Sequence, residues 1–295
     1  YSQSGRFVLV FNGEIYNYKA LRDELTERGY NFQSQGDAEV IVNLFEHEGL
    51  EALNRLRGMF AIAIWDKNND ELFLIRDQLG IKPIFYSLDN ESLIFGSEIK
   101  ALLEVLPEKL DINGQALDAL FAYTYIPAPL TIWKDIHKLK PGHYLKWHKG
   151  KVEEHKYWDL LYSLDGPTPS ISDLQDNIDD TVQAHLTSDV EVGAFLSGGI
   201  DSSSIVVRMQ HQLSLPIQAL SVKFKSKSHL FDETTYAQEL QKLHGFDLHV
   251  HSLDPTEYSS TQEAILAFDE PFSDDSIVPS MAISELASKR LKVVM

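Results

Sequence analysis

The chain has 295 residues, which is enough for two domains that each bury a core. Its net charge of −18 argues against a nucleic-acid or anionic-membrane surface as the main partner, and no apolar run approaches the roughly 20 residues of a membrane span. It contains no cysteine, which excludes a disulfide framework and thiolate metal sites, and no signal peptide is visible. A cytoplasmic location is therefore expected.

The first half of the chain predicts helices among short strands. Residues 6–11 are an apolar strand, after which Asn12-Gly13-Glu14 predicts a turn. Amphipathic helices are expected at residues 15–28, 38–48 and 115–124. Short apolar strands separated by turn residues are expected at residues 59–65, 71–76, 84–88 and 92–96, and a hairpin at residues 142–158. This order predicts an α+β fold, with antiparallel sheets covered by helices.

A composition change divides the chain. Residues 164–172 (LDGPTPSIS) hold two prolines, a glycine and several hydroxyl residues, so we expect domains at residues 1–165 and 166–295. Beyond this linker, helices are expected at residues 173–187, 235–243, 257–268 and 280–290, and strands at residues 190–196, 218–224, 247–251 and 291–295. The alternation predicts an α/β domain with a doubly wound parallel sheet.

The most informative segment of the second half is VEVGAFLSGGIDSSSIVVRMQHQL, residues 190–213, which predicts a strand, a tight turn and a helix. Gly198 and Gly199 let the backbone bend sharply and bring its N–H groups close to a ligand. Asp201 and Ser202 suit the first turn of a helix. A helix N-terminus behind such a turn binds anions, above all phosphate, although a βα turn that needs small residues for packing is the alternative. The segment lacks the lysine of GxxxxGK[ST] and the third glycine of GxGxxG.

Several blocks together resemble one known family. Residues 197–202 (SGGIDS) resemble the SGGxDS pyrophosphate loop of the N-type ATP pyrophosphatases. Upstream lie NGEIYNY at residues 12–18, GDAEVI at 36–41, RGMFA at 57–61, RDQLGIKP at 76–83 and GSEIKAL at 96–102. In this order they resemble the glutamine-hydrolysing asparagine synthetases, over nearly the whole chain. The resemblance implies a glutamine amidotransferase domain of the N-terminal-nucleophile type, followed by an ATP pyrophosphatase domain.

The resemblance implies a glutamine site in the first domain. Asn12 and Gly13 match the oxyanion-hole pair, for which an Asn amide and a backbone N–H at a strand end are suited; a simple β-to-α turn is the alternative. Glu14 and Asp37 match residues that hold the amino-acid end of glutamine, with Asp37 as the counter-charge of its ammonium group.

Two parts of the family pattern have no counterpart in these residues. The family's nucleophile is an N-terminal cysteine, and an arginine upstream of the Asn-Gly pair binds the glutamine carboxylate; this chain has no cysteine and begins after both positions. The family's second phosphate loop, SGxGxDE, would follow Met295. We expect a fragment cut at both ends that is catalytically incomplete in both halves; loss of glutaminase activity in the full protein is the alternative.

The resemblance implies ATP and Mg²⁺ in the second domain. It places adenine near Leu196 and Val222, which serve equally well as core residues, and pyrophosphate on Ser197, Gly198, Gly199, Asp201 and Ser202. Asp201 is the expected Mg²⁺ ligand, since Mg²⁺ prefers carboxylate oxygen together with substrate phosphates; helix capping is the alternative.

The implied reaction is ATP- and glutamine-dependent amidation of a small carboxylate, expected to be aspartate, through an acyl-adenylate with release of AMP and pyrophosphate. The acidic residues 269–276 match the family's acceptor-side region but lack the threonine and arginine of its asparagine-forming branch, and a solvated loop is the alternative. The alternatives are therefore a related amidotransferase with another acceptor, of the surface-polysaccharide or β-lactam-forming type, and an inactive assembly subunit. A homodimer is also an open alternative. His249 and His251 share one strand face, where packing is expected rather than a metal.

Overall fold

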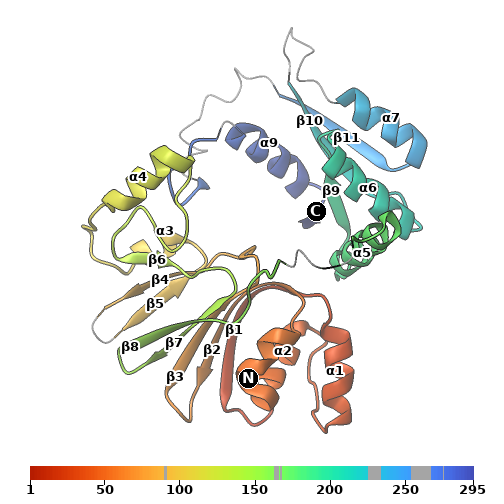
Figure 1. Ribbon diagram of the computed structural model, residues 1–295. Coiled ribbons are helices and arrows are strands. Elements are labelled where there is room, and N and C mark those ends of the chain that lie inside the picture. Colours follow the sequence, from red (N-terminus) through yellow and green to blue (C-terminus); the bar gives the residue numbers. More distant parts are fainter. Residues whose placement is uncertain (90–91, 163–165, 167, 225–233, 254–266, 275) are drawn as a thin grey trace. The chain divides into compact units, whose positions relative to one another are not determined.

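The computed structural model describes residues 1–295 except 90–91, 163–165, 167, 225–233, 254–266 and 275 (Figure 1). It divides into two compact units, each with its own core. Unit 1 comprises Tyr1–Leu164 and Asp269–Ser273, and unit 2 comprises Asp165–Phe268 and Asp274–Met295. No helix in the described ranges is long and apolar enough to cross a membrane.

Unit 1 is built on a five-stranded antiparallel sheet in the order β1-β2-β3-β7-β8. The strands are β1 (Phe7–Ile15), β2 (Gly58–Asp66), β3 (Glu71–Arg76), β7 (His143–His148) and β8 (Lys151–Lys156). One face packs against α1 (Tyr18–Glu27), α2 (Asp37–Glu48) and the 3₁₀ helix η1 (Gly49–Arg55). Successive side chains of β2 lie on opposite faces of the sheet. Phe60, Ile62 and Ile64 pack in the helix-covered core, and Ala61 and Ala63 pack on the other face.

A second, three-stranded sheet covers the opposite face of the first. It has the order β5-β4-β6, with β4 (Phe85–Leu88), β5 (Leu93–Gly96) and β6 (Ile136–Lys138). Ile84 and Tyr86 share a cluster with Ala61 and Ala63, whereas Phe85 packs with the short helix α3 (Ile99–Leu103). Unit 1 is thus layered helix, sheet, sheet, helix, and α4 (Gly114–Tyr123) follows α3 in the chain. The antiparallel α+β prediction is confirmed.

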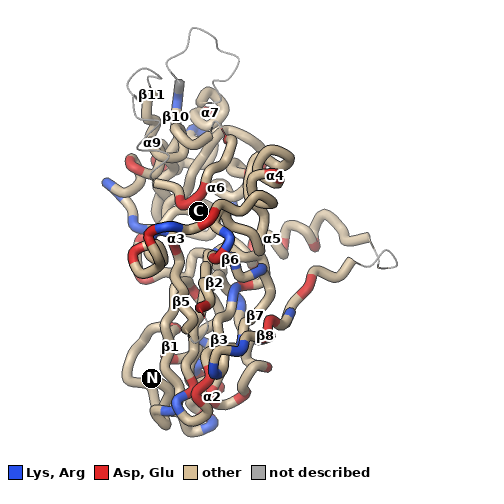
Figure 2. The backbone as a smooth tube through the Cα atoms, turned by 90° about the vertical axis from the view of Figure 1, so that its left-hand side faces the viewer, with Lys and Arg blue, Asp and Glu red and all other residues tan. Residues whose placement is uncertain are grey.

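Several charged side chains on and beside β3, β7 and β8 of unit 1 are paired. Figure 2 shows basic and acidic residues close together along β3, β7 and β8. Lys146 Nζ lies 2.7 Å from Glu71 Oε1, and Lys140 Nζ lies 2.8 Å from Glu154 Oε1. These basic groups are therefore neutralised in place by acidic neighbours.

Unit 2 is built on a four-stranded parallel sheet in the order β11-β10-β9-β12. Its strands are β9 (Val192–Phe195), β10 (Gln218–Phe224), β11 (Asp247–Leu253) and β12 (Val293–Val294). Helices α5 (Ile171–His185), α6 (Ile200–Gln212) and α7 (Thr234–His244) share a core on one face, and α9 (Ile277–Ser288) packs near Leu220 on the other. Helices on both faces of a parallel sheet confirm the doubly wound α/β prediction.

Within the described residues the expected elements are present, and the main differences concern their ends and a few short elements between them. The predicted turn at Asn12-Gly13-Glu14 is wrong, because β1 continues through Ile15, which pairs with Gly58 on β2. The helix expected from residue 15 accordingly begins at Tyr18. The sequence prediction also missed η1, α3 and β6, which are seven residues or fewer. Most of the helix expected at residues 257–268 and part of the linker start, residues 164, 165 and 167, lie outside the described residues.

Candidate functional site

Asn12, Gly13 and Glu14 lie inside the β1–β2 ladder, where they oppose Ala61, Phe60 and Met59. At Gly13 the two backbones approach so closely that a Cβ would lie 2.0 Å from the Met59 carbonyl oxygen and 2.8 Å from Phe60 Cα. Gly13 also has φ +155°, a conformation that side chains rarely adopt. The position therefore requires glycine for its geometry.

Asn12 is exposed and its side chain reaches a different part of unit 1. Its Nδ2 donates a 3.3 Å hydrogen bond to Ser97 Oγ, 85 residues away in sequence. Ser97 belongs to the GSEIKAL block directly before α3. This contact places Ser97 beside Asn12, where its hydroxyl can orient the Asn12 amide. Sequence reasoning quoted the block but gave Ser97 no role.

Asp37 is brought next to the Asn12-Gly13-Glu14 segment. It is the first residue of α2, and its Oδ2 accepts a 2.9 Å hydrogen bond from the Ile15 N–H. Tyr16 lies beside the same segment: burial raises the pKa of its hydroxyl, and the nearby carboxylates of Glu14 and Asp77 raise it further. The four predicted residues of the glutamine site thus lie within one local structure.

Asp77 fixes the strand that faces Gly13. Only 1% of Asp77 is exposed, and its carboxylate accepts hydrogen bonds from the Phe60 N–H at 3.2 Å and from the Ile81 and Lys82 N–H groups at 2.9 Å. Its neighbour Arg76 donates from Nη1 to the Leu139 carbonyl at 2.7 Å, and burial lowers the pKa of this guanidinium. The RDQLGIKP block is therefore a rigid support for β2.

In unit 2 the SGG turn lies at the carboxyl end of β9. The chain steps from β9 to β10 and β11 on one side, and β12 pairs with the other edge of β9. The strand order reverses at β9, and ligands of doubly wound sheets bind outside the carboxyl ends of the strands at such a switch point. The topology thus places residues 197–202 where this fold binds ligands.

Hydroxyl groups hold the turn in shape. Ser197 Oγ lies 2.9 Å from Ser202 Oγ and accepts a 3.2 Å hydrogen bond from the Gly199 N–H. Gly198 has φ +93°, the region that favours glycine. The first hydrogen bond of α6 runs from the Ser203 N–H to the Gly199 carbonyl at 3.0 Å, so the preceding amides belong to the open N-terminus of the helix. This arrangement suits an anion.

The donor set at this turn fits Mg²⁺ shared with a phosphate. Asp201 is exposed in the first turn of α6, so its hard carboxylate oxygens are accessible. Among the described residues, no group of three or more His, Cys, Asp or Glu side chains could hold a metal ion, and His249 and His251 belong to no such group. Asp201 therefore suits an ion whose other ligands are phosphate oxygens and water.

The two residues expected near adenine differ in burial. Leu196 is 1% exposed and packs with Val206 and Met209 of α6, as a core residue does, whereas Val222 near the end of β10 is half-buried. Between them in sequence lies Ser221, which is 1% exposed; within the described part of the chain its Oγ has no hydrogen-bond partner. Adenine contact by Leu196 and Val222 stays a prediction.

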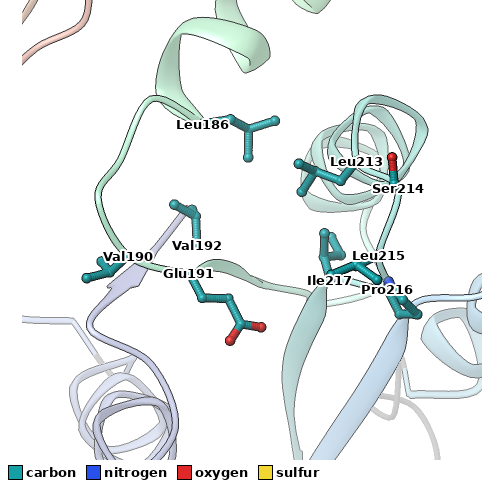
Figure 3. A pocket seen from close by; sticks show the side chains of 9 residues that line it. All are labelled: Leu186, Val190, Glu191, Val192, Leu213, Ser214, Leu215, Pro216 and Ile217. Atoms are coloured by element: carbon teal, nitrogen blue, oxygen red, sulfur yellow. The ribbon is translucent and has the colours of Figure 1, made fainter.

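An apolar pocket of about 460 Å³ lies at the other end of the same sheet. Its lining includes Val192, the first residue of β9, and Ile217, which directly precedes β10. Figure 3 shows the side chains of Leu186, Val192, Leu213 and Ile217 around its open space. The pocket thus marks the amino ends of β9 and β10, whereas the SGG turn marks the carboxyl end of β9.

The acidic segment at residues 269–276 does not behave as one solvated loop. The side chains of Asp269 and Glu270 are only 13% and 14% exposed and both make contacts within unit 1. Asp274 is exposed and accepts a 2.8 Å hydrogen bond from the Ser276 N–H before α9. The solvated-loop alternative is therefore wrong for Asp269 and Glu270.

Comparison with known proteins gives the same two-part organisation. Residues 1–158 match the glutamine amidotransferase domain family, and residues 173–295 match the asparagine synthase family. Asparagine synthetase [glutamine-hydrolyzing] 1 of Bacillus subtilis is 33% identical over 294 residues, which are 97% of this chain and 45% of that protein. A putative asparagine synthetase [glutamine-hydrolyzing] 2 of Methanocaldococcus jannaschii is 33% identical over 98% of this chain and 56% of that protein.

A relative with a different name has similar coverage. Amidase chry2 of Gibberella zeae is 29% identical over 97% of this chain and 45% of its own length. The chain spans about half the length of the curated relatives it matches. The chain belongs to the family in which a glutamine amidotransferase domain precedes an asparagine synthase domain, that of the glutamine-hydrolysing asparagine synthetases.

Proposed function

We propose that the full-length protein is a glutamine-dependent, ATP-driven ligase that converts a small carboxylate into an amide. One observation carries the proposal: the SGG turn lies at the switch point of a parallel sheet, in a chain whose residues 1–158 match the glutamine amidotransferase domain family. Family membership supports both halves of the reaction.

In unit 1, Asn12 and Gly13 would stabilise the oxyanion that forms when a nucleophile attacks the glutamine carboxamide. The Asn12 Nδ2, which donates to Ser97 Oγ, and the Gly13 N–H would be the donors, held in place by the β1–β2 ladder. Glu14 and Asp37 would bind the amino-acid end of glutamine. These 295 residues contain no cysteine, so the proposal assigns the nucleophile to a residue beyond them. A protein that lacks this residue would use free ammonia instead.

In unit 2, a carboxylate oxygen of the acceptor would attack the α-phosphorus of ATP, and pyrophosphate would leave. Ammonia would then attack the acyl carbon of the acyl-adenylate, lose a proton and expel AMP. Adenylation of the acceptor is needed because a carboxylate oxygen is a poor leaving group, whereas AMP is a good one. Ser197, Gly198, Gly199 and Ser202 would hold the pyrophosphate through hydroxyl and amide groups. Mg²⁺, with Asp201 as one ligand, would add positive charge beside the phosphates.

Aspartate is the proposed acceptor because asparagine synthetase names recur among the relatives. The similarity to amidase chry2 and the unusual sequence of residues 269–276 favour testing other carboxylates as well. A surface-polysaccharide or β-lactam-forming acceptor, and an inactive assembly subunit, are the competing proposals. Cytoplasmic location and a homodimer remain part of the proposal; cell fractionation and light scattering test them.

Exchange of labelled pyrophosphate into ATP by the full-length protein, with a panel of carboxylates, tests the synthetase half. The matched variants are Gly198→Ala and Gly245→Ala, since both glycines have positive φ, +93° and +77°, and both belong to unit 2. An added Cβ at Gly245 meets nothing within 4 Å, at a site remote in sequence from the turn.

We expect wild-type protein to show aspartate-dependent exchange. Gly198→Ala should lower the exchange rate at least about tenfold, because strain of about 1–3 kcal/mol would distort the turn. Gly245→Ala should keep the exchange rate within about twofold of wild type. Absence of exchange with every carboxylate would contradict the synthetase proposal and support an inactive subunit. Equal loss in both variants would contradict the role of the turn.

A further inference from the structure

A short acidic segment from late in the sequence belongs structurally to unit 1. Asp269–Ser273 groups with Tyr1–Leu164, whereas the described residues on either side of it in the chain belong to unit 2. The segment would be expected from its place in the sequence to serve the synthetase half. Its contacts are instead with residues of the amidotransferase unit.

Asp269 caps the start of α3. Its Oδ2 accepts a 2.6 Å hydrogen bond from the Ile99 N–H, and its Oδ1 lies 3.4 Å from the Lys100 N–H and 3.5 Å from Lys100 Nζ. With a side chain only 13% exposed, this carboxylate is largely withdrawn from water. Hydrogen bonds to charged groups are stronger than neutral ones, so Asp269 fixes the first turn of α3.

Glu270 is held from two directions. Its Oε1 accepts a 2.9 Å hydrogen bond from the Ile132 N–H, and its Oε2 forms an ion pair with Lys138 of β6. Both side chains of this pair are 14% exposed, and Lys138 Nζ also donates to the Ile126 carbonyl at 2.6 Å. The Glu270–Lys138 pair is largely buried and each partner makes a further hydrogen bond, so its geometry is better defined than that of an exposed surface pair.

The Ser273 end of the segment is also attached. The Ser273 N–H donates a 2.8 Å hydrogen bond to the Thr124 carbonyl at the end of α4. The five residues therefore bind unit 1 through Asp269, Glu270 and Ser273, at three separate places in its sequence.

Asp269 binds α3 two residues beyond Ser97, the residue that contacts Asn12 of the proposed glutamine site. The residue it caps, Ile99, follows Ser97 and Glu98, and Ser97 Oγ accepts the hydrogen bond from Asn12 Nδ2. Loss of the cap would free the turn that carries Ser97, and the Asn12 amide would lose its fixed orientation. Misplacement of a donor by about 1 Å is enough to cost catalysis heavily.

We propose that Asp269 is a positioning residue for the glutamine half of the reaction, acting through α3 and Ser97 on Asn12, and that Glu270 anchors the segment that carries Asp269. The carboxylates are already occupied by unit 1, so they are not free to bind the acceptor substrate. The inference rests on the proposed function for its kinetic part, but not for its structural part.

Amide hydrogen exchange and kinetics of the full-length protein test the proposal together. The variants are Asp269→Ala, Glu270→Gln and, as matched control, Asp274→Asn, an acid of the same stretch whose hydrogen bond is to Ser276 in unit 2. Losing a charged acceptor should speed exchange of the Ile99 amide in Asp269→Ala, and of the Ile132 amide in Glu270→Gln, by about tenfold or more. Asp274→Asn should change neither amide.

In steady-state assays, Asp269→Ala should lower kcat/KM for glutamine hydrolysis about tenfold while ammonia-dependent pyrophosphate release stays within twofold. If Asp269→Ala does not fold, Glu270→Gln carries the same test, because it loosens the attachment of the segment that holds Asp269 in place. Unchanged exchange at Ile99 and Ile132 would overturn the proposed contacts. Faster exchange with unchanged glutamine kinetics, or with an equal loss of ammonia-dependent activity, would overturn the positioning role.

A wild-type protein that performs no glutamine-dependent amidation would defeat the proposed function instead. The exchange pattern would then still report on the contacts of Asp269 and Glu270, so the two failures are distinguishable.

Discussion

Replacing Gly13 by alanine tests the close approach of β1 and β2 at the proposed glutamine site. The new methyl group would lie 2.0 Å from the Met59 carbonyl oxygen, whereas carbon–oxygen contacts between strands are about 3.3 Å, so the strands must separate by roughly 1 Å. The neighbours are backbone atoms paired across the whole ladder and cannot rotate away. Overpacking costs about 1–3 kcal/mol and backbone strain a similar amount, which gives a loss of about 4 kcal/mol.

Thermal unfolding measures this loss. In a unit of this size about 4 kcal/mol corresponds to a fall in Tm of roughly 10 °C. Gly114→Ala is the control, because Gly114 opens α4, an added Cβ meets nothing within 4 Å, and about 0.5 kcal/mol of stabilisation is expected. If Gly13→Ala melts within about 2 °C of wild type, the reasoning about the ladder is wrong.

Three further predictions concern stability. Asp77→Ala should cost more than about 3 kcal/mol in urea unfolding, because it leaves the Phe60, Ile81 and Lys82 amides without their acceptor; an unchanged midpoint would contradict this. Ser221→Ala removes a buried hydroxyl that has no partner among the described residues, so the unfolding free energy should change by less than about 0.5 kcal/mol; a larger loss would reveal a partner. Burial raises the pKa of Tyr86 to about 12, above the unfolded value near 10, so its contribution is complete below pH 10 and falls by about 1.4 kcal/mol per unit from pH 10 to 12. Tyr86→Phe should flatten that part of the pH–stability curve, and equal slopes would refute the assignment.

Much of the fold could be predicted from local pattern. The short apolar strands expected at residues 59–65 and 71–76 are present as β2 and β3, and Leu21 and Leu25 are buried as expected. Strong local signals of this kind are retained in the tertiary structure because each segment buries the face that its periodicity defines. The short elements η1, α3 and β6 were missed because segments of seven residues or fewer carry too little periodicity.

The turn predicted at Asn12-Gly13-Glu14 shows where local reasoning fails. Asn-Gly favours a turn in isolation, but the β1–β2 ladder extends to Ile15 because Gly58 on the opposite strand allows a second close approach. The pairing of β1 with β2 joins residues that are more than 40 positions apart in the sequence, so it cannot be predicted from the local pattern around Asn12.

The sequence by itself determined the two folds, the family and the residue types of both candidate sites. Those properties follow from periodicity and from motifs that are contiguous in the chain. Only the tertiary structure decided that Ser97 orients Asn12 and that Asp269 and Glu270 belong to the amidotransferase unit. The sequence pattern of an acidic loop is the same whether its carboxylates are solvated or paired. The partners of Asp269 and Glu270 include Ile99 and Lys138, which lie more than 130 residues away in the sequence.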